Sequence, residues 1–215
     1  TAKYGRGSNF KCFICSQVTP NGYVKEQSRD GLISEKLMAI VTESSNNKVI
    51  DPDNKHIEIA LSANPVWKPS EPMQKNNPTL VSGRGYGYNN WSDLFSNRQL
   101  LAITNFIDTL PEIREMLEND GATSAYSDAI ITYLAFSIDR CTNYWSSFAP
   151  WGGSFIVQTF GRQAIPMIWD YAEANPFSNS TGSWDGAVEW VAKVLEKFVP
   201  SGEGISRQVD VSKSV

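Results

Sequence analysis

Cys12 and Cys15 are the residues near the start of the chain whose type and spacing favour metal chemistry. Two residues between them let both thiolates face one zinc ion from a tight turn, but tetrahedral zinc needs two further ligands. The third cysteine, Cys141, and the single histidine, His56, lack the paired spacing of a second such turn. The residues alone leave two interpretations, half of a zinc site or two reduced cysteines in a loop. A redox pair is disfavoured because no βαβ pattern surrounds the motif.

The segment from Gly83 to Trp91 alternates glycines with one basic and three aromatic residues, which are Arg84, Tyr86, Tyr88 and Trp91. A glycine-rich turn before a helix can cradle phosphate, and aromatic rings beside a cation can stack on bases. The spacing matches neither the dinucleotide-binding fingerprint nor the P-loop. The segment therefore predicts either a nucleic-acid contact or a loop whose aromatic side chains pack on the domain.

Arg98 and Gln99 fall in the first turn of a long helix that we expect to begin at Ser96. Ser96 followed three residues later by Gln99 is a capping-box pattern. A cation in the first turn opposes the helix dipole, which favours contact between Arg98 and an anion or a carboxylate. Arg98 and Gln99 therefore join the four residues of the glycine-rich segment as candidate nucleic-acid-binding residues.

Groups for acid–base or nucleophilic chemistry are sparse. Asp170 and Glu173 are spaced to share a helix face, which suits acid–base work, but a solvated pair or an ion pair with Arg162 explains them better. The single His56 has no nucleophile signature near it, so a serine or cysteine hydrolase is disfavoured. We assign no catalytic and no cofactor-binding residue within this sequence.

The densest stretch runs from Phe160 to Phe177 and mixes large apolar with charged residues. Its apolar residues follow helical spacing, so we expect a short helix with a proline in its first turn and a stop at Asn175. The residues in that spacing are Ile165, Ile168, Trp169 and Ala172.

This stretch resembles the pattern FxRQAIPMxWDYAExNPF of the adenine-specific DNA methylases that contain a zinc ribbon. These are large prokaryotic proteins whose best-known label is a domain of unknown function. Similar family-like runs occur at residues 37–41 and 93–102. The matching positions of the main motif are Arg162, Gln163, Pro166, Trp169, Asp170, Glu173, Asn175, Pro176 and Phe177.

The resemblance implies a role for the chain as a whole. The family carries another Cys-x-x-Cys pair upstream, so Cys12 and Cys15 would be the second half of a zinc ribbon, with zinc held in the full-length protein. Its glycine motif for S-adenosylmethionine precedes this region and its Asp-Pro-Pro-Tyr catalytic segment follows it. The resemblance therefore implies an internal insertion of a methyltransferase that helps hold or recognise DNA, with S-adenosylmethionine bound only by the rest of the parent protein.

Two alternatives stay open beside that reading. A structural or partner-docking module of the same protein would suit the acidic second half of the chain. An independent hydrolase using Asp170 and Glu173 lacks a convincing set of water-activating groups. Basic residues gathered on one exposed face between 84 and 98 would favour DNA binding, whereas burial of Tyr86, Tyr88 and Trp91 would favour the module.

Composition is ordinary for a soluble globular protein, with 41% hydrophobic and 20% charged residues among 215. Residues 1–100 hold 12 basic against 9 acidic residues and the remainder 7 against 14, so a DNA contact is expected in the first half. An odd number of cysteines fits a reducing cytoplasm, and no apolar run is long enough for a membrane span.

We predict an α+β fold, mainly α-helical with a small β-rich, zinc-ribbon-like lobe at the N-terminus. The expected divisions are a half zinc-ribbon lobe at 1–50, an irregular connector at 51–90 and a helical domain at 91–200. Residues 201–215 would begin a strand leading into the missing catalytic region.

Within these divisions the patterns predict particular elements. Strands are expected at 22–25, 37–42 and 48–51, the last two pairing across the turn at 44–47. Helices are expected at 54–63, from Ser96 with a kink or restart at Pro111, at 123–147 with an apolar face that includes Tyr126 and Tyr133, and at 183–198. The inward face of the last helix is expected to carry Trp184, Val188, Val191, Val194, Leu195 and Phe198.

Overall fold

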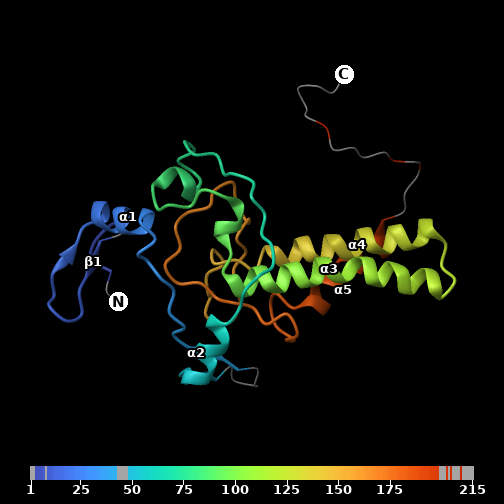
Figure 1. Cartoon of the computed structure of the whole chain (residues 1–215), viewed down its shortest axis with the longest axis horizontal. Helices are drawn as coiled ribbons and strands as arrows, with labels where there is room; N and C mark the ends of the chain where they lie inside the picture. The colour runs from blue at the N-terminus through green and yellow to red at the C-terminus, as the bar shows by residue number, and fades with distance from the viewer. Residues whose placement is uncertain are drawn as a thin grey trace.

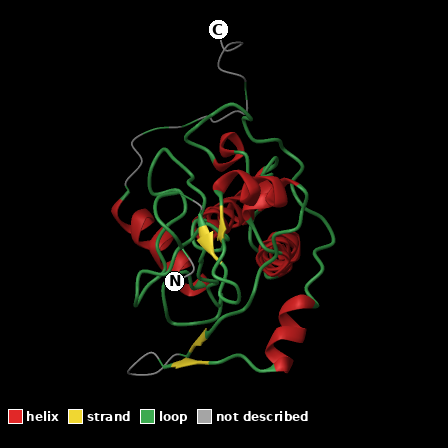
Figure 2. Ribbon diagram, turned by 90° about the vertical axis from the view of Figure 1, so that its left-hand side faces the viewer, coloured by secondary structure: helices red, strands yellow, loops and turns green. Residues whose placement is uncertain are grey.

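The computed structural model describes residues 3–7, 9–42 and 48–198, together with 202, 204 and 209. Within them the fold is α+β and mostly helical, with two small antiparallel sheets that Figure 2 shows as separate pairs of short strands. The predicted strand at 201–215 lies outside the described residues except for isolated positions. The helices are α1 (Asn21–Arg29), α2 (Asn54–Leu61), α3 (Asn97–Asn119), α4 (Ser124–Thr142) and α5 (Trp184–Lys197).

The three long helices α3, α4 and α5 pack together into what we call the helical bundle, which runs along the longest axis of the molecule (Figure 1). Each begins where a hydroxyl side chain accepts a hydrogen bond from a backbone N–H of the first turn, which satisfies one of its unpaired donors. These capping residues are Ser96, Thr123 and Ser183, as the sequence predicts for Ser96. The bundle core consists of Ile103, Ile138, Cys141, Trp145 and Ala187.

Two helix predictions are corrected in the bundle. Pro111 neither kinks nor restarts α3, which is one continuous helix through it. A proline has no N–H, so a carbonyl of the preceding turn is left without its helical partner. Because Pro111 is exposed, that side of the helix is open to hydration. The helix predicted at 123–147 ends at Thr142, and Tyr126 and Tyr133 of its predicted inner face are exposed because α3 and α5 cover other sides of α4.

A second core, which we call the loop core, lies outside the bundle and is built mostly from segments without regular structure. Its buried residues come from α1, the 65–95 region and the segment after α4. The segment from 160 to 177 is extended within it, not helical: the amide of Ile165 donates to the carbonyl of Thr79 at 2.9 Å, and that of Ala172 to Ala149 at 2.8 Å. The loop core consists of Val24, Met73, Val81, Tyr86, Leu94, Phe148 and Ile165.

The predicted helix in this segment is therefore wrong, and backbone hydrogen bonding explains why. Pro166 has no N–H to give, and the amides of Ile165 and Ala172 donate to neighbouring segments instead of to carbonyls four residues back. Ile165 forms a parallel bridge with Leu80, so the motif runs as an extended strap alongside the connector. We refer to residues 160–177 as the strap.

The N-terminal region holds less β-structure than predicted. The strand expected at 22–25 lies inside α1, which starts after the extended Pro20 and buries Val24 against the loop core. The strands are only two residues long: β1 (Phe10–Lys11) pairs with β2 (Val18–Thr19), and β3 (Ile40–Val41) with β4 (Val49–Ile50).

The second strand pair confirms the predicted pairing of the 37–42 and 48–51 runs, although most of their turn lies outside the described residues. The helix predicted at 54–63 is also confirmed, as α2. Asp53 and His56 form a reciprocal capping box at its start, so the single histidine has a structural position there.

Candidate nucleic-acid interface

Lys25 and Arg29 of α1 pack beside Gly85, the residue that follows the exposed Arg84, and we call these three basic residues the cationic surface. A Cβ atom added at Gly85 would stand 3.6 Å from Nη1 of Arg29 and 3.7 Å from Cδ of Lys25, which brings α1 to the residue next to Arg84. Arg29 and Arg84 are exposed and Lys25 is half-buried. Among the described residues none of the three forms an ion pair, although the ammonium of Lys25 lies over the ring of Tyr86.

Contacts between α1 and the loop hold this surface in place. The hydroxyl of Ser28 donates to the carbonyl of Tyr86 at 2.6 Å, and the phenol of Tyr86 donates to Oδ1 of Asn21 at 3.3 Å. Gly87 has a φ of +82°, and a Cβ there would lie 3.0 Å from the carbonyl oxygen of Ser28. Glycine is therefore required at position 87 both for its backbone conformation and for the close approach of α1.

The aromatic residues of the loop are mostly used for packing. Tyr86 is 7% exposed, and its ring lies edge-on to Trp169 with the ammonium of Lys25 5.2 Å from its centroid. Tyr88 is half-buried against Phe148, and burial, with nearby Glu35 and Asp93, raises its pKa. Of these three aromatic residues only Trp91 is exposed, with 38% of its surface accessible to solvent. Tyr86 is thus not placed to stack on a base, and only Trp91 has an open face.

Arg98 is engaged by other residues of the protein. Its Nε donates to Oε1 of Glu173 at 2.7 Å and its Nη2 to Oε2 at 3.0 Å, a two-pronged ion pair. Nη1 also donates to the carbonyl of Ala60, and Glu35 lies 3.3 Å from Nη2. The hydrogen bond to Glu173 and the surrounding negative charge raise the pKa of Arg98, so it stays charged.

This ion pair joins three parts of the chain. Arg98 begins α3, Glu173 belongs to the strap, and Ala60 lies at the end of α2. Tyr171 lies within the same group, and burial together with Glu35 raises the pKa of its phenol. The carboxylate contact favoured by the sequence is therefore made inside the molecule, and Arg98 is a positioning residue, not an open anion contact.

Gln99 also has a structural position. Its side-chain carbonyl accepts from the amide of Ser96 at 2.8 Å, and the hydroxyl of Ser96 accepts from the amide of Gln99. Gln99 is buried, so the capping box predicted from the sequence is present and the residue is not available to a ligand.

The start of the strap is exposed and tightly turned. The amide of Ala164 donates to the carbonyl of Arg162 at 2.8 Å, and the amide of Phe160 donates to Oδ1 of Asn143 at 2.9 Å. Arg162 and Gln163 therefore project from a fixed turn into solvent.

The rest of the strap anchors other segments. Trp169 packs edge-on between Phe10, at 4.9 Å between ring centroids, and Tyr86. Asp170 is exposed, and because the strap is extended it does not share a helix face with Glu173, whose ion-pair partner is Arg98 and not Arg162. The acid–base pair considered from the sequence is therefore not assembled.

The strap ends in a turn at its last three motif residues. Oδ1 of Asn175 accepts from the amide of Phe177 at 3.0 Å, and the carbonyl of Pro176 accepts from the amide of Trp184 at 2.8 Å. Phe177 is exposed, with its ring 6.1 Å from that of Phe106. Pro166 is half-buried, and together with this turn it fixes the path of the strap across the domain.

The Cys-x-x-Cys pair lies in the turn of the β1–β2 hairpin, and both thiols are exposed. Backbone N–H groups of Cys15 and Ile14, and then the side chain of Cys15, lower the pKa of the Cys12 thiol. N–H groups directed at sulfur favour the thiolate that zinc needs, so this turn fits half of a tetrahedral site.

The described residues include no group of three or more His, Cys, Asp or Glu side chains that would hold a metal. Cys141 is not near this turn: it belongs to the bundle core, where burial raises its pKa to about 12. Cys141 is thus a buried residue of the bundle core.

Lys25 and Arg29 were not predicted as contact residues, because a strand was expected at 22–25 and no helix was expected to connect Lys25 to Arg29. A signal for them was present, since four residues separate the two on a stretch that follows Pro20. On a helix that spacing places both cations on one face, about one turn apart.

Comparisons with known proteins add no assignment. No protein-family model matches the chain, and searches of curated proteins and of solved structures find no significant match. Among the described residues no helix has the length and apolar character to cross a membrane.

Proposed function

We propose that this chain is the DNA-holding insertion domain of an adenine-specific DNA methyltransferase, and that it contacts the phosphate backbone through the cationic surface. The observation that carries the proposal is the gathering of Lys25, Arg29 and Arg84 beside a glycine-rich loop without ion-pair partners among the described residues. The resemblance of the strap to the methylase motif supports the choice of DNA. The S-adenosylmethionine site and the catalytic segment would belong to other parts of the parent protein.

The proposed DNA contact differs from the one that was predicted from the sequence. Arg84 remains a contact residue, whereas Arg98, Gln99 and Tyr86 now support the fold around it. Trp91 stays as an exposed candidate contact residue, and the motif residues Arg162 and Gln163 are exposed as well. The surface is small, so it would position a duplex and would not read its sequence.

Zinc enters the proposal through the N-terminal hairpin. Cys12 and Cys15 would supply two thiolates, and the remaining ligands would come from outside the described residues. The hairpin is tied to the strap by Phe10 on Trp169, so a metal there would fix the position of β1 relative to the loop core. Cys12 and Cys15 would supply the negative charge and the geometry of this half of the zinc site. A bound metal would make the hairpin more rigid.

The test is a titration of the chain with a 20-base-pair duplex and a single strand of the same sequence across a salt series. Each phosphate contact contributes a slope of about 0.9 in log affinity against log salt, so three contacts predict a slope near 3 for the duplex. We expect the Lys25→Ala/Arg29→Ala/Arg84→Ala variant to lose binding and to flatten this slope.

A matched control removes three charges elsewhere, as Lys48→Ala/Lys55→Ala/Lys193→Ala. Lys55 lies on α2, well away from α1, and Lys193 lies on α5 (Figure 1). The control variant should keep the slope of the unmodified chain. Equal losses in both variants would mean that net charge alone drives binding, which would sink the proposed surface.

A structural module of the same protein is the second candidate, and a specific observation favours it. Tyr86 is buried and Arg98 is held by Glu173, so two of the expected contact residues serve the fold. Absence of duplex binding at low salt would select this candidate and leave DNA recognition to the rest of the parent protein.

A further inference from the structure

α5 has two apolar faces, and the bundle uses only one of them. Ala187 is buried against Cys141 and Trp145, and Trp184 packs on Phe106. Val194 and Phe198 were predicted to face inward, but they are 53% and 66% exposed, and Trp190 is 54% exposed. The inward prediction fails for them, and for half-exposed Leu195, because α4 covers only the first half of α5 closely.

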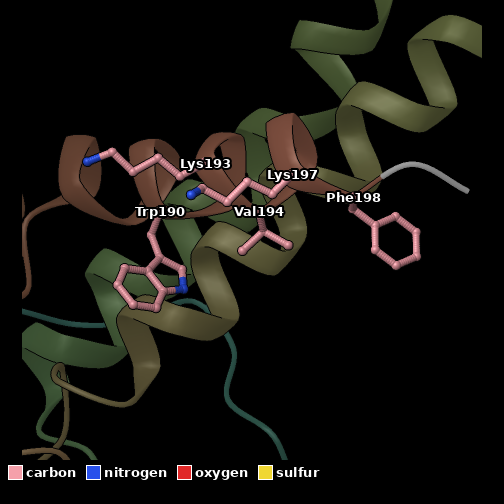
Figure 3. A pocket seen from close by; sticks show the side chains of 5 residues that line it. All are labelled: Trp190, Lys193, Val194, Lys197 and Phe198. Atoms are coloured by element: carbon pink, nitrogen blue, oxygen red, sulfur yellow. The ribbon is translucent and has the colours of Figure 1, made fainter.

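The exposed residues form a continuous row. Trp190, Val194 and Phe198 are spaced by four, so they follow one face of the helix. Together with Lys193 and Lys197 they line a shallow groove of about 360 Å³ along the C-terminal half of α5, shown in Figure 3. A contiguous apolar surface of this kind usually marks a contact site, whereas isolated exposed apolar residues are common. We call it the α5 groove.

The rim of the groove is cationic. Lys193 and Lys197 line it, and among the described residues no carboxylate does. At its start the guanidinium of Arg140 from α4 lies 4.1 Å from the centroid of the Trp190 ring. Glu189 pairs with Lys193 at 2.8 Å but stands outside the groove. An occupant must therefore present apolar side chains flanked by negative charge.

A second copy of this chain does not meet that requirement. Two identical helices packing on this face would be related by a two-fold axis near Val194, the middle residue of the row. Lys193 and its copy would then lie one residue from the axis and close to each other. Like charges facing each other across such a contact are unfavourable, so self-association is disfavoured.

We propose that the α5 groove binds an amphipathic helix of a partner protein, with an apolar stripe flanked by Asp and Glu residues. A helix laid in such a groove inserts apolar side chains at spacings of three and four residues between Trp190, Val194 and Phe198. Its carboxylates then lie beside Lys193, Lys197 and Arg140. The binding is independent of the DNA contact, which lies on α1 and the glycine-rich loop.

The experiment uses the whole 215-residue chain and two labelled helical peptides. One carries a leucine stripe flanked by glutamates, and the other has the same stripe flanked by lysines. Fluorescence anisotropy should show the acidic peptide binding at least 10-fold more tightly than the basic one. The Val194→Asp variant should lose this binding, and because Val194 is exposed its helical circular dichroism should stay unchanged.

A charge swap tests the rim directly. In the Lys193→Glu/Lys197→Glu variant the basic peptide should bind more tightly than the acidic one. A surface that binds any apolar peptide without regard to charge would not show this reversal. Equal binding of both peptides by the unmodified chain, or binding of neither, would overturn the proposal. So would dimerisation of the chain alone, seen by light scattering and abolished by Val194→Asp, because the groove would then be a self-interface.

Discussion

The helical bundle and the loop core are held together by different kinds of interaction. The bundle begins each helix with a hydroxyl cap and fills its centre with side chains that recur along each helix. The loop core joins segments that are far apart in sequence through single backbone hydrogen bonds, such as Ile165 to Thr79 and Ala172 to Ala149. Local signals therefore specify the first region, and long-range pairing specifies the second.

The difference matters for the proposed function, because the candidate contact residues belong to the loop core. Arg84 ends a single turn of 3-10 helix at Val81–Arg84, and the strap has no regular element to fix it. Their positions depend on the glycine conformations, on the edge-on ring contacts of Trp169 and on the ion pair of Arg98 with Glu173. A surface built this way is more sensitive to distant substitutions than one on a helix.

Truncating the central side chain of the bundle should have the largest effect on stability. Trp145 is 2% exposed, and its indole N–H donates to the carbonyl of Gly182 at 2.6 Å. Trp145→Ala leaves a cavity and an unpaired carbonyl, so we expect a loss of about 3–5 kcal/mol in the free energy of unfolding by urea. The matched control Trp190→Ala, at an exposed site, should cost about 1 kcal/mol or less. Similar losses in both would mean that the burial of Trp145 does not stabilise the bundle.

Removing the ion pair that joins the two regions should have an intermediate effect. Arg98→Ala leaves Glu173 partly buried without its two-pronged partner, so we expect a loss of about 1–3 kcal/mol. Arg98→Lys keeps the charge but not the fork geometry and should recover only part of it.

A double-mutant cycle with Glu173→Gln separates this pair from its surroundings, and a coupling of about 0.5–3 kcal/mol is expected. Arg114→Ala is the comparison, because Arg114 pairs with Asp128 and Glu118 at the surface of the bundle and should cost less. A larger effect at Arg114 would show that Arg98 does not link the strap to the bundle.

What could be predicted from the sequence follows the same division. The cap at Ser96, the start of α5 after Ser183 and the helix α2 all depend on neighbours within four residues, and all are confirmed. The helix expected in the strap is wrong because the amide of Ile165 is used by Thr79, some eighty residues away. No periodicity within the strap can indicate that partner.

The candidate contact surface was predicted only in part for a related reason. Arg84 was named from the glycine-rich pattern, but Lys25 and Arg29 join it only because α1 packs on that loop. The inward face predicted for the second half of α5 is wrong for a different reason. Apolar spacing locates the apolar face of a helix, but it does not indicate whether the protein itself covers that face. Both errors come from tertiary packing, which a single sequence does not report.

The smallest effect should come from adding one methyl group at either of two glycines with positive φ. Gly121, between α3 and α4, has a φ of +91° and open space around it, whereas Gly87 has a φ of +82° and faces Ser28 and Arg29 of α1. Both alanine variants pay about 1 kcal/mol or slightly more for the left-handed backbone. Gly87→Ala must in addition displace α1, because its Cβ would lie 3.0 Å from the carbonyl oxygen of Ser28 and 3.1 Å from Cα of Arg29. Urea unfolding should therefore show a larger loss at Gly87 than at Gly121, and equal losses would mean that α1 is not held tightly against the loop and that the cationic surface is not a fixed arrangement.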